Sequence, residues 1–283
     1  GALTLTANDT SASTSYTGYT KGTVAAGTEA KILLDADYRI TTGTGNLTAT
    51  IAAGTHESGN ITLGNISTTG TTGVVTLNTS STEGNSANST LNATVVNQVA
   101  LELGASTVGG NLTATATAGN ITQSAALAVT GTSTFITGAD GSNIILGNSG
   151  NVFTAAVTMK ADTGGNEAFG NITFVDSAAV KLHSSASTGG DLFIDAGTDG
   201  AVGGNLSITA TIGNITQGVA LTIGGTSAFI TSADEADITL ASTNAFTGAV
   251  SFTTAGTNGD VTVVDGGAFG LGASTINGNL SLT

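Results

Sequence analysis

The sequence contains no proline, no cysteine and no tryptophan, and it has a single methionine. Without cysteine the chain can form neither a disulfide nor a thiolate metal site. Charged residues make up 8% of the chain, against about 25% in an average soluble protein, which argues against helical surfaces and against disorder. Hydrophobic residues make up 39%, so the composition predicts a folded, strand-rich protein.

Positive charge is also scarce. The chain carries five lysine and arginine residues against 19 aspartate and glutamate residues, which gives a formal net charge of −14. Binding of nucleic acid depends on clustered positive charge that displaces counterions from phosphates, so we expect no nucleic-acid partner. No apolar run approaches the roughly 18 residues of a membrane span, so we also expect no membrane insertion.

The abundant residues, including 42 glycines, occur in repeated phrases. The phrase GGNLTATATAGNITQ at 109–123 returns as GGNLSITATIGNITQ at 203–217. Two further pairs are GTSTFIT with GTSAFIT (131–137 and 225–231) and NVFTAAV with NAFTGAV (151–157 and 244–250). Because the order of the phrases is kept, the sequence indicates a repeat architecture.

Within each repeat, short alternating runs such as LTATAT at 112–117 and ITFV at 172–175 are separated by turn-forming residues. Short strands at this spacing predict an all-β fold. Because whole phrases recur without hairpin symmetry, we expect a parallel β-helix, or β-solenoid, of roughly a dozen coils rather than a β-sandwich. The general preference for right-handed crossovers favours a right-handed helix. The predicted rod covers 41–283, and 1–40 is expected to form an N-terminal strand, cap or subunit-joining segment.

The β-helix hypothesis assigns a place to each abundant residue type. Small aliphatic side chains fill a narrow interior that large aromatic rings rarely fit. Glycine and asparagine mark the corners because they tolerate positive φ. Asn111, Asn205 and Asn279 share one phrase position, so we expect them in one ladder whose amides bond along the axis.

Three phrases resemble the repeats of filamentous haemagglutinin-like, two-partner-secretion or autotransporter-type bacterial exoproteins. They are GGNLTATATAGNITQSAALAVTGTSTFIT, NVFTAAVTM and LGASTINGNLSLT. The resemblance covers most of the chain from about residue 40 and is specific for architecture. It implies a right-handed β-helix that is exported to the cell surface or the medium, where such repeats serve as stalks and scaffolds.

No residue set predicts a catalytic site or a cofactor. Asp195 and Asp199 are weak candidates for Ca²⁺ binding through oxygen ligands, and a second acidic group contains Asp234, Glu235 and Asp237. A polysaccharide-active β-helix would need paired carboxylates in a cleft, and this enzyme class stays the second alternative function. The two histidines, at positions 56 and 183, are far apart and predict surface residues rather than metal ligands.

Thirteen asparagines lie in N-x-S/T sequons, which can carry glycans in an exported protein. A turn asparagine followed by an apolar residue and threonine produces the same pattern without glycans, so both interpretations stay open. The candidate glycosylation sites are Asn46, Asn60, Asn111, Asn120, Asn171, Asn205 and Asn214.

The expected function is structural: a rod segment, or the subunit of an extracellular fibre. Its expected partner is a second copy stacked head to tail through backbone hydrogen bonds, or the continuation of a longer chain. The alternative is an adhesin passenger region that binds a host or environmental glycan or protein, with loops 10–28 and 80–88 as the places to look. The predicted subunit-joining residues are Gly1, Ala2, Leu3, Thr4, Leu5 and Thr6 at one end and Asn279, Leu280, Ser281, Leu282 and Thr283 at the other.

Overall fold

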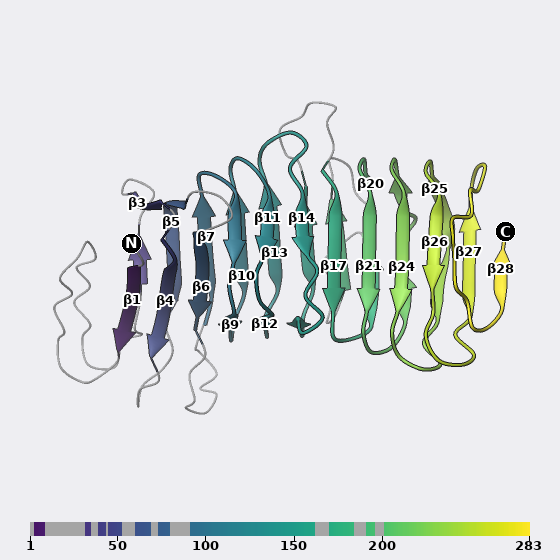
Figure 1. The fold of residues 1–283 in the computed structure, drawn as a ribbon, viewed down its shortest axis with the longest axis horizontal. Helices are drawn as coiled ribbons and strands as arrows, with labels where there is room; N and C mark the ends of the chain where they lie inside the picture. Colours follow the sequence, from purple (N-terminus) through teal and green to yellow (C-terminus); the bar gives the residue numbers. More distant parts are fainter. Residues whose placement is uncertain are drawn as a thin grey trace.

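The computed structural model shows an elongated stack of strands with the two termini at opposite ends (Figure 1). It describes residues 3–8, 32–34, 39–43, 45–52, 60–68, 73–79, 91–161, 170–183, 191–195 and 201–283. All regular secondary structure in these ranges is β-strand. Within the same ranges, no helix is long and apolar enough to cross a membrane.

The described strands form two large sheets, in which every strand pair is parallel. The first sheet contains β1 (Leu3–Asn8), β4 (Leu47–Ala52), β6 (Val74–Asn78), β8 (Leu101–Leu103), β9 (Ser106–Val108), β11 (Ile121–Gln123), β12 (Leu127–Val129), β14 (Ile144–Leu146), β15 (Val152–Phe153), β17 (Ile172–Asp176), β21 (Leu206–Ala210), β24 (Ser227–Thr231) and β26 (Val250–Thr253). The second sheet contains β2 (Ile32–Leu34), β3 (Ile40–Gly43), β5 (Ile61–Thr68), β7 (Ala93–Asn97), β10 (Leu112–Ala116), β13 (Ser133–Thr137), β16 (Val157–Lys160), β18 (Val180–His183), β19 (Asp191–Asp195), β20 (Ala201–Val202), β22 (Ile215–Gln217), β23 (Thr222–Ile223), β25 (Ile238–Phe246), β27 (Val261–Asp265) and β28 (Leu280–Leu282).

This architecture confirms the prediction of an all-β fold with parallel strands and is consistent with a β-solenoid-like fold. We use "coil" for one passage of the chain from a strand to its hydrogen-bonded neighbour further along the sequence. Because each strand pairs with a strand one coil away, residues at equivalent positions lie in columns along the long axis of the molecule.

Alternation along each strand sends every second side chain into the interior. In β10, β13, β21 and β24 the first, third and fifth residues are buried and the two between them are half-buried. Most inward residues are aliphatic, as expected, but the interior also takes six buried phenylalanines, contrary to the expectation that such rings rarely fit. They pack in two groups, for example Phe153 against Phe174 with ring centroids 5.4 Å apart and Phe229 against Phe252 at 6.0 Å.

Candidate functional site

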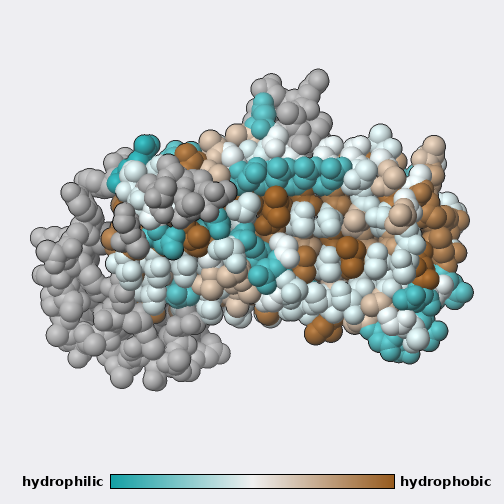
Figure 2. Space-filling view, in the orientation of Figure 1, coloured by the Kyte–Doolittle hydropathy of each residue, from teal (hydrophilic) through white to brown (hydrophobic). Residues whose placement is uncertain are grey.

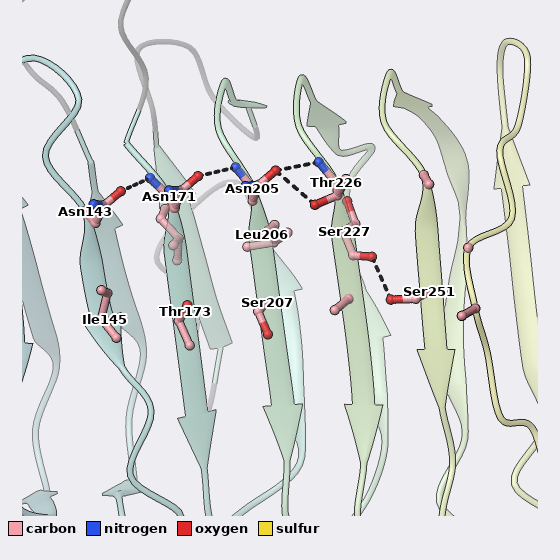
Figure 3. A pocket seen from close by; sticks show the side chains of 15 residues that line it. Asn143, Ile145, Asn171, Thr173, Asn205, Leu206, Ser207, Thr226, Ser227 and Ser251 are labelled. Atoms are coloured by element: carbon pink, nitrogen blue, oxygen red, sulfur yellow. Dashed lines mark hydrogen bonds between the residues drawn. The ribbon is translucent and has the colours of Figure 1, made fainter.

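Polar residues just before the strands form ladders that run from coil to coil. In each ladder the side-chain Oδ1 of one residue accepts a hydrogen bond from the backbone N–H of the next ladder member. The first ladder joins Asn60, Asn92, Asn111 and Thr132 (2.8–2.9 Å), the second joins Asn120, Asn143, Asn171, Asn205 and Thr226 (2.7–2.8 Å), and the third joins Asn214, Asp237, Asp260 and Asn279 (2.6–2.9 Å). Figure 3 shows the second ladder from Asn143 to Thr226. These bonds run along the axis and connect the coils to one another.

The predicted axial ladders of asparagine therefore exist, but their predicted membership is wrong. Asn111, Asn205 and Asn279 belong to three different ladders. The strands inside the two copies of the long phrase, β10 and β21, lie in different sheets. Longer coils separate these copies: Asn171 follows Asn143 by 28 positions and Asn205 follows Asn171 by 34, against 19–23 positions per step in the third ladder.

The glycines directly before Asn171, Asn205 and Thr226 of the second ladder allow neighbouring coils to approach closely. A Cβ on Gly225 would lie 2.6 Å from the carbonyl oxygen of Gly204, and a Cβ on Gly204 would lie 2.6 Å from that of Gly170. Positive φ, the expected reason for glycine and asparagine at corners, occurs among the described residues at Gly119, Gly141, Gly213, Gly256, Glu235 and Asn258. At Gly170, Gly204 and Gly225 the ladder thus selects glycine for its missing side chain, whereas Gly119 and Gly213, which precede Asn120 and Asn214, also have positive φ. The ladder asparagines are selected for their acceptor oxygen.

Two side-chain amides, one buried and one half-buried, bind each other at one corner of the stack and are here called the amide lock. Asn151 is fully buried, and its Oδ1 accepts hydrogen bonds from the Gln123 side chain (2.8 Å) and from the backbone N–H of Leu127 (3.0 Å). Its Nδ2 donates to the Gln123 Oε1 (2.9 Å) and to the carbonyl oxygen of Val175 (3.1 Å). The Asn151 side chain thus forms hydrogen bonds with residues of the coil before it and of the coil after it.

The second repeat builds the same amide lock from Gln217 and Asn244. Asn244 exchanges hydrogen bonds with Gln217, accepts from the Leu221 N–H (2.8 Å) and donates to the carbonyl oxygen of Val264 (2.9 Å). The sequence analysis did not identify these four side chains as a unit. The signal was present, because NITQ at 120–123 and 214–217 recurs together with the phrase that begins at 151 and 244, and both copies keep the glutamine and the asparagine of the lock.

Asp176 lies at the same corner. Its Oδ1 accepts a hydrogen bond from the Phe153 N–H (3.2 Å), and the residue is buried. Burial raises the pKa of the Asp176 carboxyl above its ordinary value of 3.8, while backbone hydrogen bonds from Phe153, Ser177 and Ala178 act in the opposite direction. Folding therefore disfavours the ionised form of Asp176 relative to the unfolded chain.

The raised pKa makes the stability contribution of Asp176 depend on pH. This contribution is fully present below the unfolded pKa and is lost as the pH rises through the raised folded pKa. We expect Asp176→Asn to remove this pH-dependent loss of stability. Between about pH 4 and pH 7, the free energy of unfolding of the variant relative to that of the wild type should therefore increase with pH. Urea unfolding across this range measures the difference.

Asp234 provides a control of opposite sign. It is exposed, and hydrogen bonds from the backbone N–H and the hydroxyl of Thr257 lower the pKa of its carboxyl. Its contribution is present above the unfolded pKa and lost as the pH falls through the lowered one, so Asp234→Asn should change the slope in the opposite direction, and only below about pH 4. Equal slopes for wild type and Asp176→Asn would contradict the assignment.

The last coil leaves one face of the stack open. Leu271, Leu280 and Leu282 are 47%, 40% and 44% exposed, although each pairs with a buried valine of the preceding coil. The bonds between β27 and β28 use the peptide groups of Asn279, Ser281 and Thr283. By the alternation of a parallel ladder, the N–H and C=O groups of Leu280 and Leu282 therefore point away from the stack.

The opposite end of the stack is only partly open. Leu3 and Leu5 of β1 are half-buried and pair with buried residues of β4, whereas Ile32 and Leu34 of β2 are buried. Thr4, another predicted joining residue, is exposed on β1. Gly1 and Ala2 lie outside the described residues, as does the side chain of Thr6.

A shallow groove of about 570 Å³ runs over the outer face of the first sheet. One wall is the second ladder from Asn143 to Thr226 (Figure 3), and Figure 2 shows this hydrophilic row with hydrophobic surface directly beside it. The floor is a column of outward residues in register: Ile145, Thr173, Ser207, Ala228, Ser251 and Gly272. No residue that lines the groove is charged or aromatic.

The structure gives each candidate glycosylation asparagine a hydrogen-bonding role. Oδ1 of all seven accepts a backbone N–H from another coil; Asn46 accepts from Val74 (3.1 Å), and the other six are members of the three ladders. This role explains the repeated Asn-x-Ser/Thr pattern without glycans. Glycosylation itself stays a prediction.

The remaining predicted sites have few described side chains. Asp199, His56 and the loops 10–28 and 80–88 lie outside the described residues, and Asp195 and His183 are described only as parts of β19 and β18. Asp234 and Asp237 accept backbone hydrogen bonds from the next coil. In the described part of the chain, no three His, Cys, Asp or Glu residues gather as metal ligands. The calcium candidates stay a prediction.

Comparison with known proteins returns one family. A model described as repeats of unknown function (DUF5649) matches residues 90–160 and 169–253, two adjacent repeats that contain the two copies of the long phrase. No curated protein and no solved structure matches the chain. The match supports a repeat protein and gives no link to haemagglutinin-like or autotransporter exoproteins.

Proposed function

Since the chain belongs to the DUF5649 family of repeats of unknown function, we propose that it is a structural rod whose coils continue by end-to-end stacking. The rod would be a right-handed β-helix of roughly a dozen coils. Its place would be the cell surface or the medium of a bacterium, a part of the proposal that rests on the resemblance of the repeat phrases to secreted exoproteins.

Connections along the axis support a mechanical role. Parallel strand pairing, three polar ladders and two amide locks all join one coil to the next. A protein built from such nearest-neighbour contacts is stiff along one direction and extends by adding units.

The open face of the last coil is the observation that carries the stacking proposal. Three half-exposed leucines and the outward peptide groups of Leu280 and Leu282 form an apolar and hydrogen-bonding edge. Asn279 ends the third ladder, and its Oδ1 has no donor among the described residues. A further parallel coil, from a second copy or from the continuation of a longer chain, would satisfy all of these groups at once.

Sheet membership decides which strands of two stacked copies would meet. β28 belongs to the second sheet and β1 to the first, so continuation of the ladders would place β1 of the next copy over 271–275. The sequence-based pairing of Gly1–Thr6 with Asn279–Thr283 would instead require the next copy to be rotated. Because Ile32 and Leu34 are already buried, β1 supplies the more open edge at that end.

Electron microscopy and sedimentation velocity of the purified chain test the proposal. We expect filaments longer than one copy and sedimentation that increases with protein concentration. Leu280→Asp should abolish both, because it places a charge on the open edge. Ile212→Asp, which changes an exposed apolar residue between β21 and β22, away from both ends of the stack, is the matched control and should assemble like the wild type. Dispersed single rods for the wild type would refute stacking, and rods of exactly two copies would refute its head-to-tail form.

A further inference from the structure

The groove on the first sheet has features of a binding surface that the rod function does not require. Its floor rises and falls with side-chain size, from Ile145 at one end to Ala228 and Gly272 toward the other. It crosses several coils, which are about 4.8 Å apart. A ligand that follows it must therefore be linear and must present similar chemistry at each step.

The wall of the groove presents a row of hydrogen-bond donors. Oδ1 of Asn171 and of Asn205 is occupied by the backbone N–H of the next ladder member. This occupancy fixes the amide plane and leaves each Nδ2 without a partner among the described residues. Hydroxyl groups of Thr173 and Ser207 lie on the floor beside these amides. The groove thus combines polar groups that repeat coil by coil with the carbon surface of residues such as Ile145 and Ala228.

The negative charge of the chain argues against an anionic ligand in the groove. None of the lining residues is charged, and the chain carries a net charge of −14, so an anionic polymer would be repelled without any local cation to hold it. Nucleic acids and acidic polysaccharides are disfavoured for this reason. A neutral polysaccharide has repeating hydroxyl acceptors and apolar C–H faces, which match amide donors along one wall and small apolar residues on the floor.

We propose that this groove binds a linear, neutral polysaccharide, with Asn171 and Asn205 donating hydrogen bonds to its hydroxyl oxygens. This binding function is additional to the rod function and does not depend on end-to-end stacking. Many weak contacts along one rod would add to the total affinity, because binding of one polymer segment keeps the next segment close to the part of the groove that binds it.

Asn205→Asp tests the proposal without removing the ladder. The carboxylate keeps an oxygen that can accept the Thr226 N–H, as Asp237 does for Asp260, but it loses the amide donors and adds a negative charge. Asn111→Asp is the matched control. Asn111 holds the equivalent position of the repeated phrase, is exposed like Asn205, and binds the Thr132 N–H at 2.9 Å, but it lies outside the groove.

Affinity electrophoresis in gels that contain hydroxyethyl cellulose, galactomannan or, as an anionic control, polygalacturonate provides the measurement. We expect at least one neutral polymer to retard the wild type, no retardation by polygalacturonate, and about tenfold weaker binding for Asn205→Asp, since one lost hydrogen bond corresponds to that factor. Asn111→Asp should bind like the wild type. Absence of retardation by both neutral polymers, or equal weakening by the two variants, would overturn the proposal.

A second variant fills the groove and keeps its charge. Thr173→Ile adds bulk to the floor, and Thr216→Ile makes the same change at an outward, half-buried position of β22 in the second sheet. Both variants should fold, because isoleucine suits strand positions. Only Thr173→Ile should weaken retardation by the neutral polymer. Assembly measured by sedimentation should be unchanged in both, which separates this proposal from the stacking proposal.

Discussion

Asn151→Ala is expected to lower the free energy of unfolding by about 3–5 kcal/mol, because it leaves several buried polar groups without partners. The backbone N–H of Leu127, the carbonyl oxygen of Val175 and the Gln123 amide all lose a hydrogen bond. Leu127 is fully buried, so its N–H cannot turn to solvent and retains its desolvation cost, while Gln123 and Val175 are half-buried. Urea denaturation followed by far-UV circular dichroism measures the loss.

Two comparisons show whether the amide lock is the cause. Asn244→Ala should have a similar effect, since Asn244 makes the equivalent contacts with Leu221 and Val264. Asn111→Ala removes a single bond at an exposed position and should cost only about 0.5–1.5 kcal/mol. A loss at Asn151 no larger than the loss at Asn111 would show that the buried amide contributes little.

Gly225→Ala is expected to destabilise the protein by about 2–4 kcal/mol through a clash between coils. Its Cβ would lie 2.6 Å from the carbonyl oxygen of Gly204 and 2.4 Å from Oδ1 of Asn205. Backbone cannot rotate away as a side chain can, so the two coils must separate, and this weakens the ladder bond between Asn205 and Thr226. Thermal or urea unfolding detects the change.

Gly147→Ala is the matched control for this substitution. A Cβ at Gly147 would have its nearest neighbour, a methyl group of Thr173, at 3.8 Å, which is an ordinary van der Waals contact. We expect a change within about 0.5 kcal/mol of the wild type. If both alanine variants were equally stable, close approach of the coils would not be the reason for glycine at 225.

The repeated phrases predicted the kind of structure well but the partners of individual residues poorly. Alternating LTATA and ITFV runs specify strands with one buried side, because the period of two is a local property of the backbone. The axial role of asparagine followed from its place before those strands. That Asn111, Asn205 and Asn279 occupy different ladders did not follow, because coil length decides which residues become neighbours.

In the candidate site, too, the sequence identified the residue types, and only the folded structure identified their neighbours. Asn171 and Asn205 were singled out as sequons, whereas their position on one wall of a groove depends on the register of β17 with β21 and of β21 with β24. Gln123 and Asn151 are 28 residues apart, and only the return of the chain after one coil brings their amides together. No local pattern encodes such a pairing distance.

The sequence by itself determined the all-β repeat architecture, the strand positions and the acidic, cysteine-free character of the chain, since composition and local periodicity specify these properties. Only the tertiary structure decided the ladder partners, the two amide locks, the need for glycine at close contacts and the open edge at Leu280 and Leu282. The physical reason is that hydrogen bonding and packing in this fold connect neighbouring coils. Which atoms meet therefore depends on the accumulated length of each coil, a property of the folded stack as a whole.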